Sequence, residues 1–424
     1  INKAQGDQDV ISARIYTDEE LNIRVNAGRL TLSGGLSGTG DFVSTGNGVL
    51  TVRGNAVSSL SDLWLQNRGG TGTGAQVELG ATGGAAFGNV RIGSASLGSA
   101  GNAVLQLLEN RVLSTSLPAI DQGNQIGDLA TVIADGASSR FAYFKLMGGS
   151  ETIGNIIDVG SSLVLENMEG ETVNRSASLT LGGNNLDSFI GGFVRNRAGG
   201  SGIGKLGLTK NGTGSLTLRG GNISYTGSTL LNGGTLNLIN TTSFASSIIA
   251  AVGTNINVDT QGSTINFDDS VLGAANLSKF GSGNLSFNSG AANLDSLSSF
   301  EGTVSFRSGD GSLRGEKAFI EQSLTLRGTP GLNKSLSIGS SLSAGNISLD
   351  GGRRDVFAIS TIASQIYNTN SIGSAFDAVV EATDHFDFSS VSLRLNSVGS
   401  TIDRVVQNAA NGTSLTLTDV SNLV

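Results

Sequence analysis

The sequence predicts an all-β fold, a right-handed parallel β-helix (β-solenoid) with about 20 residues per rung that allows small insertions. Three observations predict it. The 424 residues include 63 Gly but only 2 Pro, short segments alternate apolar residues with Ser or Thr, and similar segments recur along the chain. Alternation with a period of two places every second side chain on the same face of a strand. Regular recurrence of such strands indicates stacked units that share one continuous core.

Composition excludes several other classes of protein. Apolar residues make up 38% of the chain, too many for a disordered protein. Neither a G-X-Y period nor Pro enrichment is present, so the glycines do not indicate collagen. Charged residues make up 14%, below the roughly 25% of typical soluble domains. This balance favours one elongated β body over several compact domains.

Three segments superimpose without gaps. They are residues 42–52 (FVSTGNGVLTV), 208–218 (LTKNGTGSLTL) and 277–287 (LSKFGSGNLSF). Each contains two glycines separated by one residue, followed by an apolar-x-apolar strand. We expect these glycines to adopt positive φ at the corners between strands, where a Cβ would clash. The pairs are Gly46 and Gly48, Gly212 and Gly214, and Gly281 and Gly283.

The spacing of equivalent strands gives the size of one rung. Residues 26–32 (NAGRLTL) match 232–238 (NGGTLNL), and residues 300–306 (FEGTVSF) are a looser copy. Equivalent apolar positions recur at a nearly constant interval of about 20 residues, which is the length of one β-solenoid rung. The three pairs that show this interval are Leu30 and Leu50, Leu216 and Leu236, and Leu285 and Val304.

Changes in pattern divide the chain into four expected regions. Residues 1–101 are N-terminal solenoid rungs, and 102–147 are a less regular insertion or modified rungs. Residues 148–352 are the central solenoid with the repeat units, and 353–424 are a strand-rich region that caps the solenoid or joins subunits. Within 102–147 and 353–383 the pattern fits either a short helix or strands with larger side chains.

Residues 202–238 resemble the autotransporter-associated strand repeat, also called the passenger-associated transport repeat. Partial copies begin at residues 36 and 272, with Ser44 and Lys279 at the position of the repeat's Lys. The resemblance covers about a third of the chain. It implies a right-handed β-helix, secretion and a surface-exposed passenger region, but no single activity. The matching positions are Leu208, Lys210, Gly212, Gly214, Leu216, Leu218, Gly220, Asn222, Tyr225, Gly227, Thr229, Gly234 and Leu236.

We expect no enzyme activity and no catalytic residues. His385 is the one histidine, so it is the sole candidate base for a Ser-His-Asp triad. The GDGS sequence at residues 309–312 is better explained as a turn. A glycan-cleaving site would need carboxylates on one face of the coil, but the acidic pairs do not recur at rung spacing. Those pairs are Asp268 and Asp269, Asp384 and Asp387, and Glu166 and Glu169.

We also expect no cofactor and no bound metal. The sequence lacks the calcium-binding patterns D-x-[DN]-x-[DN]-G and G-G-x-G-x-D. The glycine-rich stretches beginning at Gly69 and Gly202 lack the Lys-Ser or Lys-Thr of a phosphate-binding loop. Arg53, Arg219 and Arg327 each precede a glycine, which favours exposed corner positions over a binding ridge.

Charge and hydropathy limit the partners and the location. The net charge is −8 and no basic stripe is present, which argues against nucleic acid. The chain contains no run of about 18 apolar residues, so we expect no membrane-spanning helix in it. The absence of Cys is compatible with export. We therefore expect a secreted, extracellular protein of the bacterial cell surface.

Three functions follow in order of preference. The first is a structural and adhesive surface protein that assembles with itself, head to tail, into a filament or matrix through end-to-end solenoid contacts. The second is a monomeric autotransporter adhesin that binds surface glycans or proteins. The third is a polysaccharide-cleaving β-helix enzyme.

Overall fold

The computed structural model describes the chain as a series of short strands and turns. The described residues are 1–54, 61–66, 72–81, 85–93, 101–108, 124–136, 140–167, 175–197, 204–288, 292–306, 312–327, 334–350, 357–361, 365–369, 371–372 and 393–395, with backbone alone from 312 onward. Every helix or strand assigned within these ranges is a β-strand, and the strands pair in parallel. The predicted all-β parallel β-helix is therefore confirmed. The chain divides into two compact units, residues 1–234 and 235–424.

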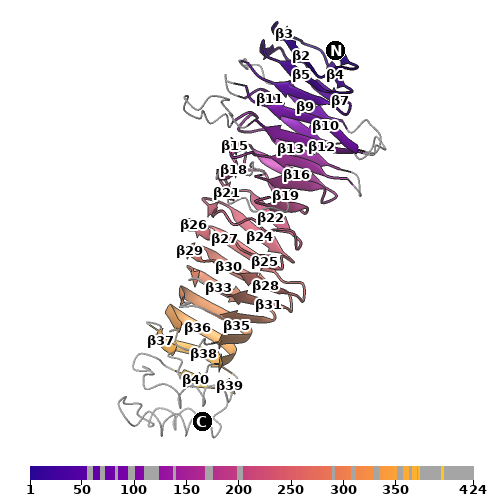
Figure 1. The fold of residues 1–424 in the computed structure, drawn as a ribbon. Helices are drawn as coiled ribbons and strands as arrows, with labels where there is room; N and C mark the ends of the chain where they lie inside the picture. The colour runs from indigo at the N-terminus through magenta and orange to yellow at the C-terminus, as the bar shows by residue number, and fades with distance from the viewer. Residues whose placement is uncertain are drawn as a thin grey trace. The chain divides into compact units, whose positions relative to one another are not determined.

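Unit 1 (residues 1–234) winds through three stacks of parallel strands, which we call sides 1, 2 and 3 (Figure 1). Side 1 contains β1 (Asn2–Lys3), β4 (Leu21–Val25), β7 (Phe42–Thr45), β9 (Ser61–Leu65), β11 (Phe87–Ile92), β13 (Thr131–Asp135), β16 (Asn155–Val159), β19 (Ser188–Ile190) and β22 (Ser215–Arg219). Side 2 contains β2 (Gln8–Ile11), β5 (Arg29–Leu32), β8 (Val49–Val52), β10 (Gly72–Leu79), β12 (Gly101–Leu107), β14 (Ala142–Lys145), β17 (Leu163–Glu166) and β20 (Phe193–Arg195). Side 3 contains β15 (Ser150–Thr152), β18 (Ala177–Leu181), β21 (Leu206–Lys210) and β23 (Thr229–Leu231), and β3 (Ile15–Tyr16) and β6 (Leu36–Ser37) form a separate two-stranded sheet.

Unit 2 (residues 235–424) also places three strands in each of its first turns. One stack contains β24 (Thr235–Ile239), β27 (Asn255–Asp259), β30 (Asn276–Phe280) and β33 (Ser296–Ser299). The second contains β25 (Ser243–Phe244), β28 (Thr264–Phe267), β31 (Asn284–Phe287) and β34 (Thr303–Phe306), and the third contains β26 (Ile248–Ala250), β29 (Val271–Gly273) and β32 (Ala292–Asn293). The remaining strands are β35 (Ser312–Arg327), β36 (Lys334–Asp350), β37 (Phe357–Thr361), β38 (Gln365–Thr369), β39 (Ser371–Ile372) and β40 (Leu393–Leu395).

The core is a set of apolar columns, one residue from each turn. On side 2 of unit 1 each inward residue lies in register with the next, and all of them are buried. Full burial of each such side chain contributes about 1.5–3 kcal/mol to folding. This column contains Leu30, Leu50, Val77, Leu105, Phe144, Leu165 and Val194.

The predicted rung length holds where the chain is regular. Leu30 pairs with Leu50, and Leu285 pairs with Val304, so each of these steps takes about 20 residues. Longer steps occur in unit 1, because Val90 pairs with Val132, about twice as far along the chain. Strands β12 and β14, together with β37 and β38, show that the helical alternative is wrong for the described parts of 102–147 and 353–383. Residues 109–123 and 373–383 lie outside the described part of the chain.

The paired glycines have two different roles. The first of each pair, Gly46, Gly212 and Gly281, has a φ of 98°, 69° and 77° respectively, as predicted. The second of each pair is not among the positive-φ residues, so that half of the prediction is wrong. A Cβ added at Gly283 would lie 1.8 Å from the carbonyl oxygen of Ser263 in the preceding turn. The second glycine is therefore required by the close approach of adjacent turns.

Candidate functional site

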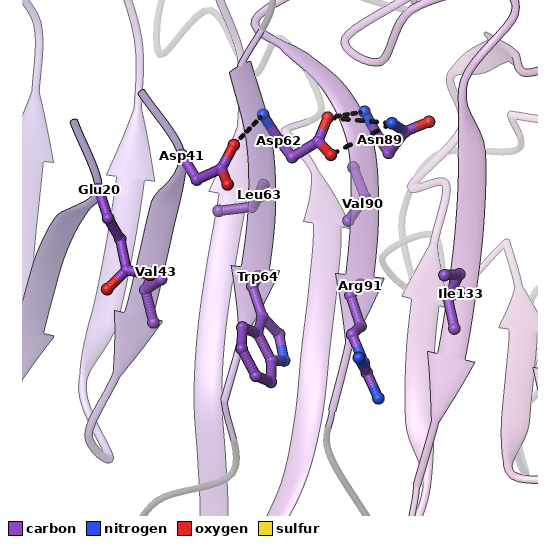
Figure 2. A pocket seen from close by; sticks show the side chains of 10 residues that line it. All are labelled: Glu20, Asp41, Val43, Asp62, Leu63, Trp64, Asn89, Val90, Arg91 and Ile133. Carbon is purple, nitrogen blue, oxygen red and sulfur yellow. Dashed lines mark hydrogen bonds between the residues drawn. The ribbon is translucent and has the colours of Figure 1, made fainter. Parts of the chain in front are cut away.

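A groove of about 210 Å³ lies on the outer face of side 1, across strands β4 to β13 (Figure 2). Two rows of outward side chains form its walls, each taking one residue from successive turns. We call them the acidic row, which contains Glu20, Asp41, Asp62 and Asn89, and the aromatic row, which contains Val43, Trp64, Arg91 and Ile133. Figure 2 shows that the two rows share three successive segments, which carry Asp41 with Val43, Asp62 with Trp64, and Asn89 with Arg91.

The register of side 1 explains the acidic row. Phe42 pairs with Leu21 and with Leu63, and Leu63 pairs with Val90. Each member of the acidic row directly precedes one of these four residues, so the row recurs once per turn. Parallel strands lie about 4.8 Å apart. All four side chains of the row belong to exposed residues.

The acidic row also joins adjacent turns by hydrogen bonds. The backbone N–H of Asp62 donates to Asp41 Oδ1 at 3.3 Å, and the backbone N–H of Asn89 donates to Asp62 Oδ1 at 2.8 Å. Asn89 Nδ2 donates to both carboxylate oxygens of Asp62, at 3.1 and 3.2 Å. The N–H of Thr131 donates to Asn89 Oδ1 at 2.9 Å. Asp41, Asp62 and Asn89 thus each accept a backbone N–H from the next strand.

The aromatic row follows from the same register. Trp64 pairs with Val43 on one side and Arg91 on the other, and Arg91 pairs with Ile133. Because alternate residues of a strand face opposite sides, this row points outward while the intervening Leu63 points into the core. Leu63 is accordingly buried.

The half-buried indole of Trp64 is held in position by two contacts. Its Nε1–H donates to the carbonyl oxygen of Gly93 at 3.1 Å. The guanidinium carbon of Arg91 lies 5.1 Å from the centre of the indole ring, which is within cation–π range. Arg91 also forms an ion pair with the largely buried Asp135. The aromatic surface is therefore already ordered before any ligand arrives.

The electrostatic balance of the groove is negative. Glu20, Asp41 and Asp62 supply three carboxylates, whereas the charge of Arg91 is offset by Asp135. Charges this close to a protein surface interact by several kcal/mol with a ligand charge in contact. The groove therefore disfavours anionic ligands. Within the described residues, no group of three or more His, Cys, Asp or Glu side chains is arranged to hold a metal ion.

The acidic residues selected from the sequence have other contacts. Asp268 Oδ1 accepts a bond from Asn288 Nδ2 at 2.7 Å, and Asp269 Oδ1 accepts the N–H of Ser270 at 2.7 Å. Glu166, with 1% of its side chain exposed, pairs with Arg195 at 2.8 Å and with Lys145 at 3.8 Å. These bonds connect adjacent turns or close local ones. The other candidates, Glu169, Asp384, His385, Asp387 and residues 309–311, lie outside the described part of the chain.

The three candidate corner arginines are placed as follows. Arg53 directly follows β8, and Arg219 is the last residue of β22. Both are exposed. Arg327 is the last residue of β35, where only the backbone is described.

Two lysines of the repeat motif are buried, a role that we did not predict from the sequence. Lys210 and Lys279 both have 0% exposure and occupy the positions where alternation would place an apolar residue. Lys210 Nζ donates to the carbonyl oxygens of Asn211 and Gly212. Lys279 Nζ donates to Gly281 O at 2.7 Å and to the carbonyl of the following turn, Glu301 O, at 2.6 Å.

The pKa values of these lysines reflect their surroundings. Burial lowers the pKa of Lys210 below its usual value, and it lowers the pKa of Lys279 to about 8. Nearby carboxylates oppose the shift in both cases, Asp187 beside Lys210 and Glu301 beside Lys279. Since each ammonium is directed at turn carbonyls, we assign these lysines a structural role.

One further carboxyl group, that of Glu151, is buried on side 3. Glu151 lies in β15, in register with the buried Leu179, and therefore faces the core. Burial raises the pKa of Glu151 to about 8, even though its carboxylate accepts the backbone N–H of Gln125 at 2.8 Å and of Thr152 at 3.2 Å. The Glu151 carboxyl therefore provides a buried acceptor for the backbone N–H of Gln125.

Comparison with known proteins gives no relative for this chain: no family model, no curated protein and no solved structure matches it. In the described part of the chain, no helix is long and apolar enough to cross a membrane.

Proposed function

We propose that the chain is a secreted protein of the bacterial cell surface with a structural and adhesive role, and that it is not an enzyme. One observation carries the proposal. The core-facing side chains and the hydrogen bonds between turns hold adjacent turns together. The outer face of side 1, in contrast, carries a groove with an ordered aromatic ring. Such a surface suits binding rather than covalent chemistry.

The repeat motif supports the proposal that the chain is an autotransporter passenger region. In residues 202–238 the Tyr and Thr of the motif meet inside the protein, because the hydroxyl of Tyr225 lies 2.6 Å from Thr229 Oγ1 and both residues are buried. Lys210 and Gly212 belong to one corner through the bond between Nζ and the Gly212 carbonyl. These motif residues therefore have structural roles, Tyr225 and Thr229 in the core and Lys210 and Gly212 at a corner.

Self-assembly through end-to-end contacts is part of the proposal. The first turn carries an ion pair that affects such a contact. Lys3 is in register with the buried Val25, and Asp9 is in register with the buried Leu30. The two side chains form an ion pair at 2.8 Å. An apolar contact on this rung would have to cover that pair, at a desolvation cost. We therefore expect any assembly through this rung to use backbone hydrogen bonds.

Two measurements on the purified chain test the proposed role. Negative-stain imaging over a range of protein concentrations reports self-assembly, and discrete monomers at the highest concentration would contradict the filament. Beads coated with the chain report adhesion to immobilised polysaccharides and proteins. Saturable adhesion without polymer would favour the monomeric adhesin, and absence of both polymer and adhesion would overturn the proposed role.

The polysaccharide-cleaving alternative has its own test. Release of reducing ends from a polysaccharide panel, abolished by Asp41→Asn or Asp62→Asn, would establish it. We expect no release. The oxygens of Asp62 accept two hydrogen bonds from Asn89 Nδ2 and one from its backbone, so that carboxylate is committed to joining adjacent turns.

A further inference from the structure

We infer that the groove on side 1 of unit 1 binds a neutral glycan chain, with Trp64 as the stacking surface and the acidic row as the hydrogen-bonding edge. The inference rests on the proposed adhesive function and assigns a ligand class and residues to it. It is carried by the cavity, the ordered indole and the row of carboxylates, all of which belong to unit 1.

The indole supplies the apolar contact that a sugar ring needs. The C–H groups of a pyranose face carry partial positive charge, and the face of an indole is negative. Trp64 is fixed by its bond to Gly93 O and by the neighbouring Arg91, so little side-chain entropy is lost on binding. The ring is also half exposed at the groove.

The acidic row supplies acceptors at a regular interval. Asp41 and Asp62 lie on adjacent strands, which in a parallel sheet are about 4.8 Å apart. Asp41 accepts its inter-turn bond at Oδ1, and Glu20 accepts at Oε1 from Asn22 Nδ2 at 2.8 Å. Sugar hydroxyls can donate to the second oxygen of Asp41 and of Glu20 and accept from the guanidinium of Arg91. A glycan lying across the strands would meet these acceptors on adjacent turns.

Charge selects a neutral ligand over a charged one. An acidic polysaccharide would approach three carboxylates, and the cation in the groove, Arg91, is already paired with Asp135. A basic peptide would find the cation site of the indole already occupied, because the guanidinium of Arg91 lies 5.1 Å from the ring centre. A neutral chain of hydroxyl groups meets neither penalty.

Trp64 is the one tryptophan of the 424-residue chain, so intrinsic fluorescence reports directly on this groove. We would titrate the purified chain with cellohexaose, maltohexaose, xylohexaose and mannohexaose, and with polygalacturonate and hexalysine as charged probes. The expected result is a saturable fluorescence change with at least one neutral oligosaccharide and none with the charged probes. Calorimetric titration then gives the affinity of each variant.

The variants separate the groove from general charge effects. Asp41→Asn and Trp64→Ala should each weaken binding about tenfold or more. Asp7→Asn, which also removes one exposed negative charge but lies outside the groove, should leave binding unchanged. Thermal unfolding of each variant checks that it is folded, and Asp41→Asn keeps the test valid if Trp64→Ala does not fold.

Three results would overturn the inference: no saturable response to any neutral oligosaccharide, a response confined to polygalacturonate or hexalysine, or equal affinity in Asp41→Asn and the unaltered chain. The bead assay distinguishes this failure from failure of the proposed function. If coated beads still adhere and the groove variants adhere equally, the groove assignment falls and the adhesive role stands. If no surface is bound and no polymer forms, both fall.

Discussion

Replacing Lys210 by Met tests whether the buried lysines of the repeat stabilise the turns. The substitution removes the ammonium but keeps an unbranched side chain of similar length. Two carbonyl oxygens, those of Asn211 and Gly212, then lose a charged donor. An unsatisfied carbonyl costs about 1–3 kcal/mol when fully buried. The cost should be lower here, because both residues are only partly buried and because removing the ammonium also removes the cost of burying it. We therefore expect the substitution to lower the free energy of unfolding by about 2–4 kcal/mol.

The control is Lys205→Met, five positions earlier in the same unit. Lys205 is exposed, and we expect a change within about 0.5 kcal/mol.

Urea unfolding followed by far-UV circular dichroism gives the stability of each variant. Hydrogen exchange of the peptides covering residues 206–219 shows whether the loss is local to that corner. Equal stability of Lys210→Met and Lys205→Met would refute the reasoning, because water would then satisfy the turn carbonyls as well as the ammonium does.

Three other changes test the fold. The Glu151 carboxyl keeps its proton up to about pH 8 in the folded state but only up to about pH 4.5 in the unfolded chain. The free energy of unfolding should therefore fall as pH rises through this window, by at most about 5 kcal/mol. Glu151→Gln should remove this pH dependence in unfolding titrations. Gly283→Ala, whose Cβ would lie 1.8 Å from a backbone oxygen, should destabilise more in thermal unfolding than Gly253→Ala, which strains only the backbone at a φ of 78° because its Cβ meets nothing within 4 Å. Leu105→Ala should cost about 2–5 kcal/mol in urea, and the exposed Leu186→Ala less than about 0.5.

The sequence predicts the fold well because the signals of a solenoid are local. Alternation assigns each residue of a strand to the inside or the outside, and the distance from Leu30 to Leu50 gives one turn directly. The prediction weakens where a turn is lengthened. The long segment between Val90 and Val132 carries no pattern that would identify these two as register partners.

The groove was not predicted, although part of its signal is present in the sequence. Glu20, Asp41 and Asp62 recur at equal intervals of one rung, each directly before a strand residue of side 1. The acidic pairs considered as candidates are close together in the chain, whereas the members of this row are a whole turn apart. The fourth member, Asn89, follows after a longer interval, so its place in the row depends on the register of β9 and β11.

The buried lysines were missed for a different reason. A lysine in a strand is ordinarily assigned to the solvent side, because burial of an ammonium is costly. At Lys279 that cost is met by two carbonyl oxygens, one in its own corner and one in the next turn. The position of the first follows from Gly281 itself, whose φ of 77° turns the chain at that corner. Burial of the lysine can therefore be predicted only when the lysine is considered together with the glycine two residues after it.

The alternation of a strand separates the residues of the groove from those of the fold. Along β9 the outward Asp62 and Trp64 flank the inward Leu63, and β11 repeats the arrangement with Val90 between Asn89 and Arg91. Exchanging an outward residue leaves the apolar column intact, so the ligand preference of the groove can change at little cost to the core. The acidic row is the exception, because its oxygens also accept backbone N–H groups of the next turn. Substitution of Asp41 by Asn keeps an acceptor oxygen there, so binding and stability should be separable at that position.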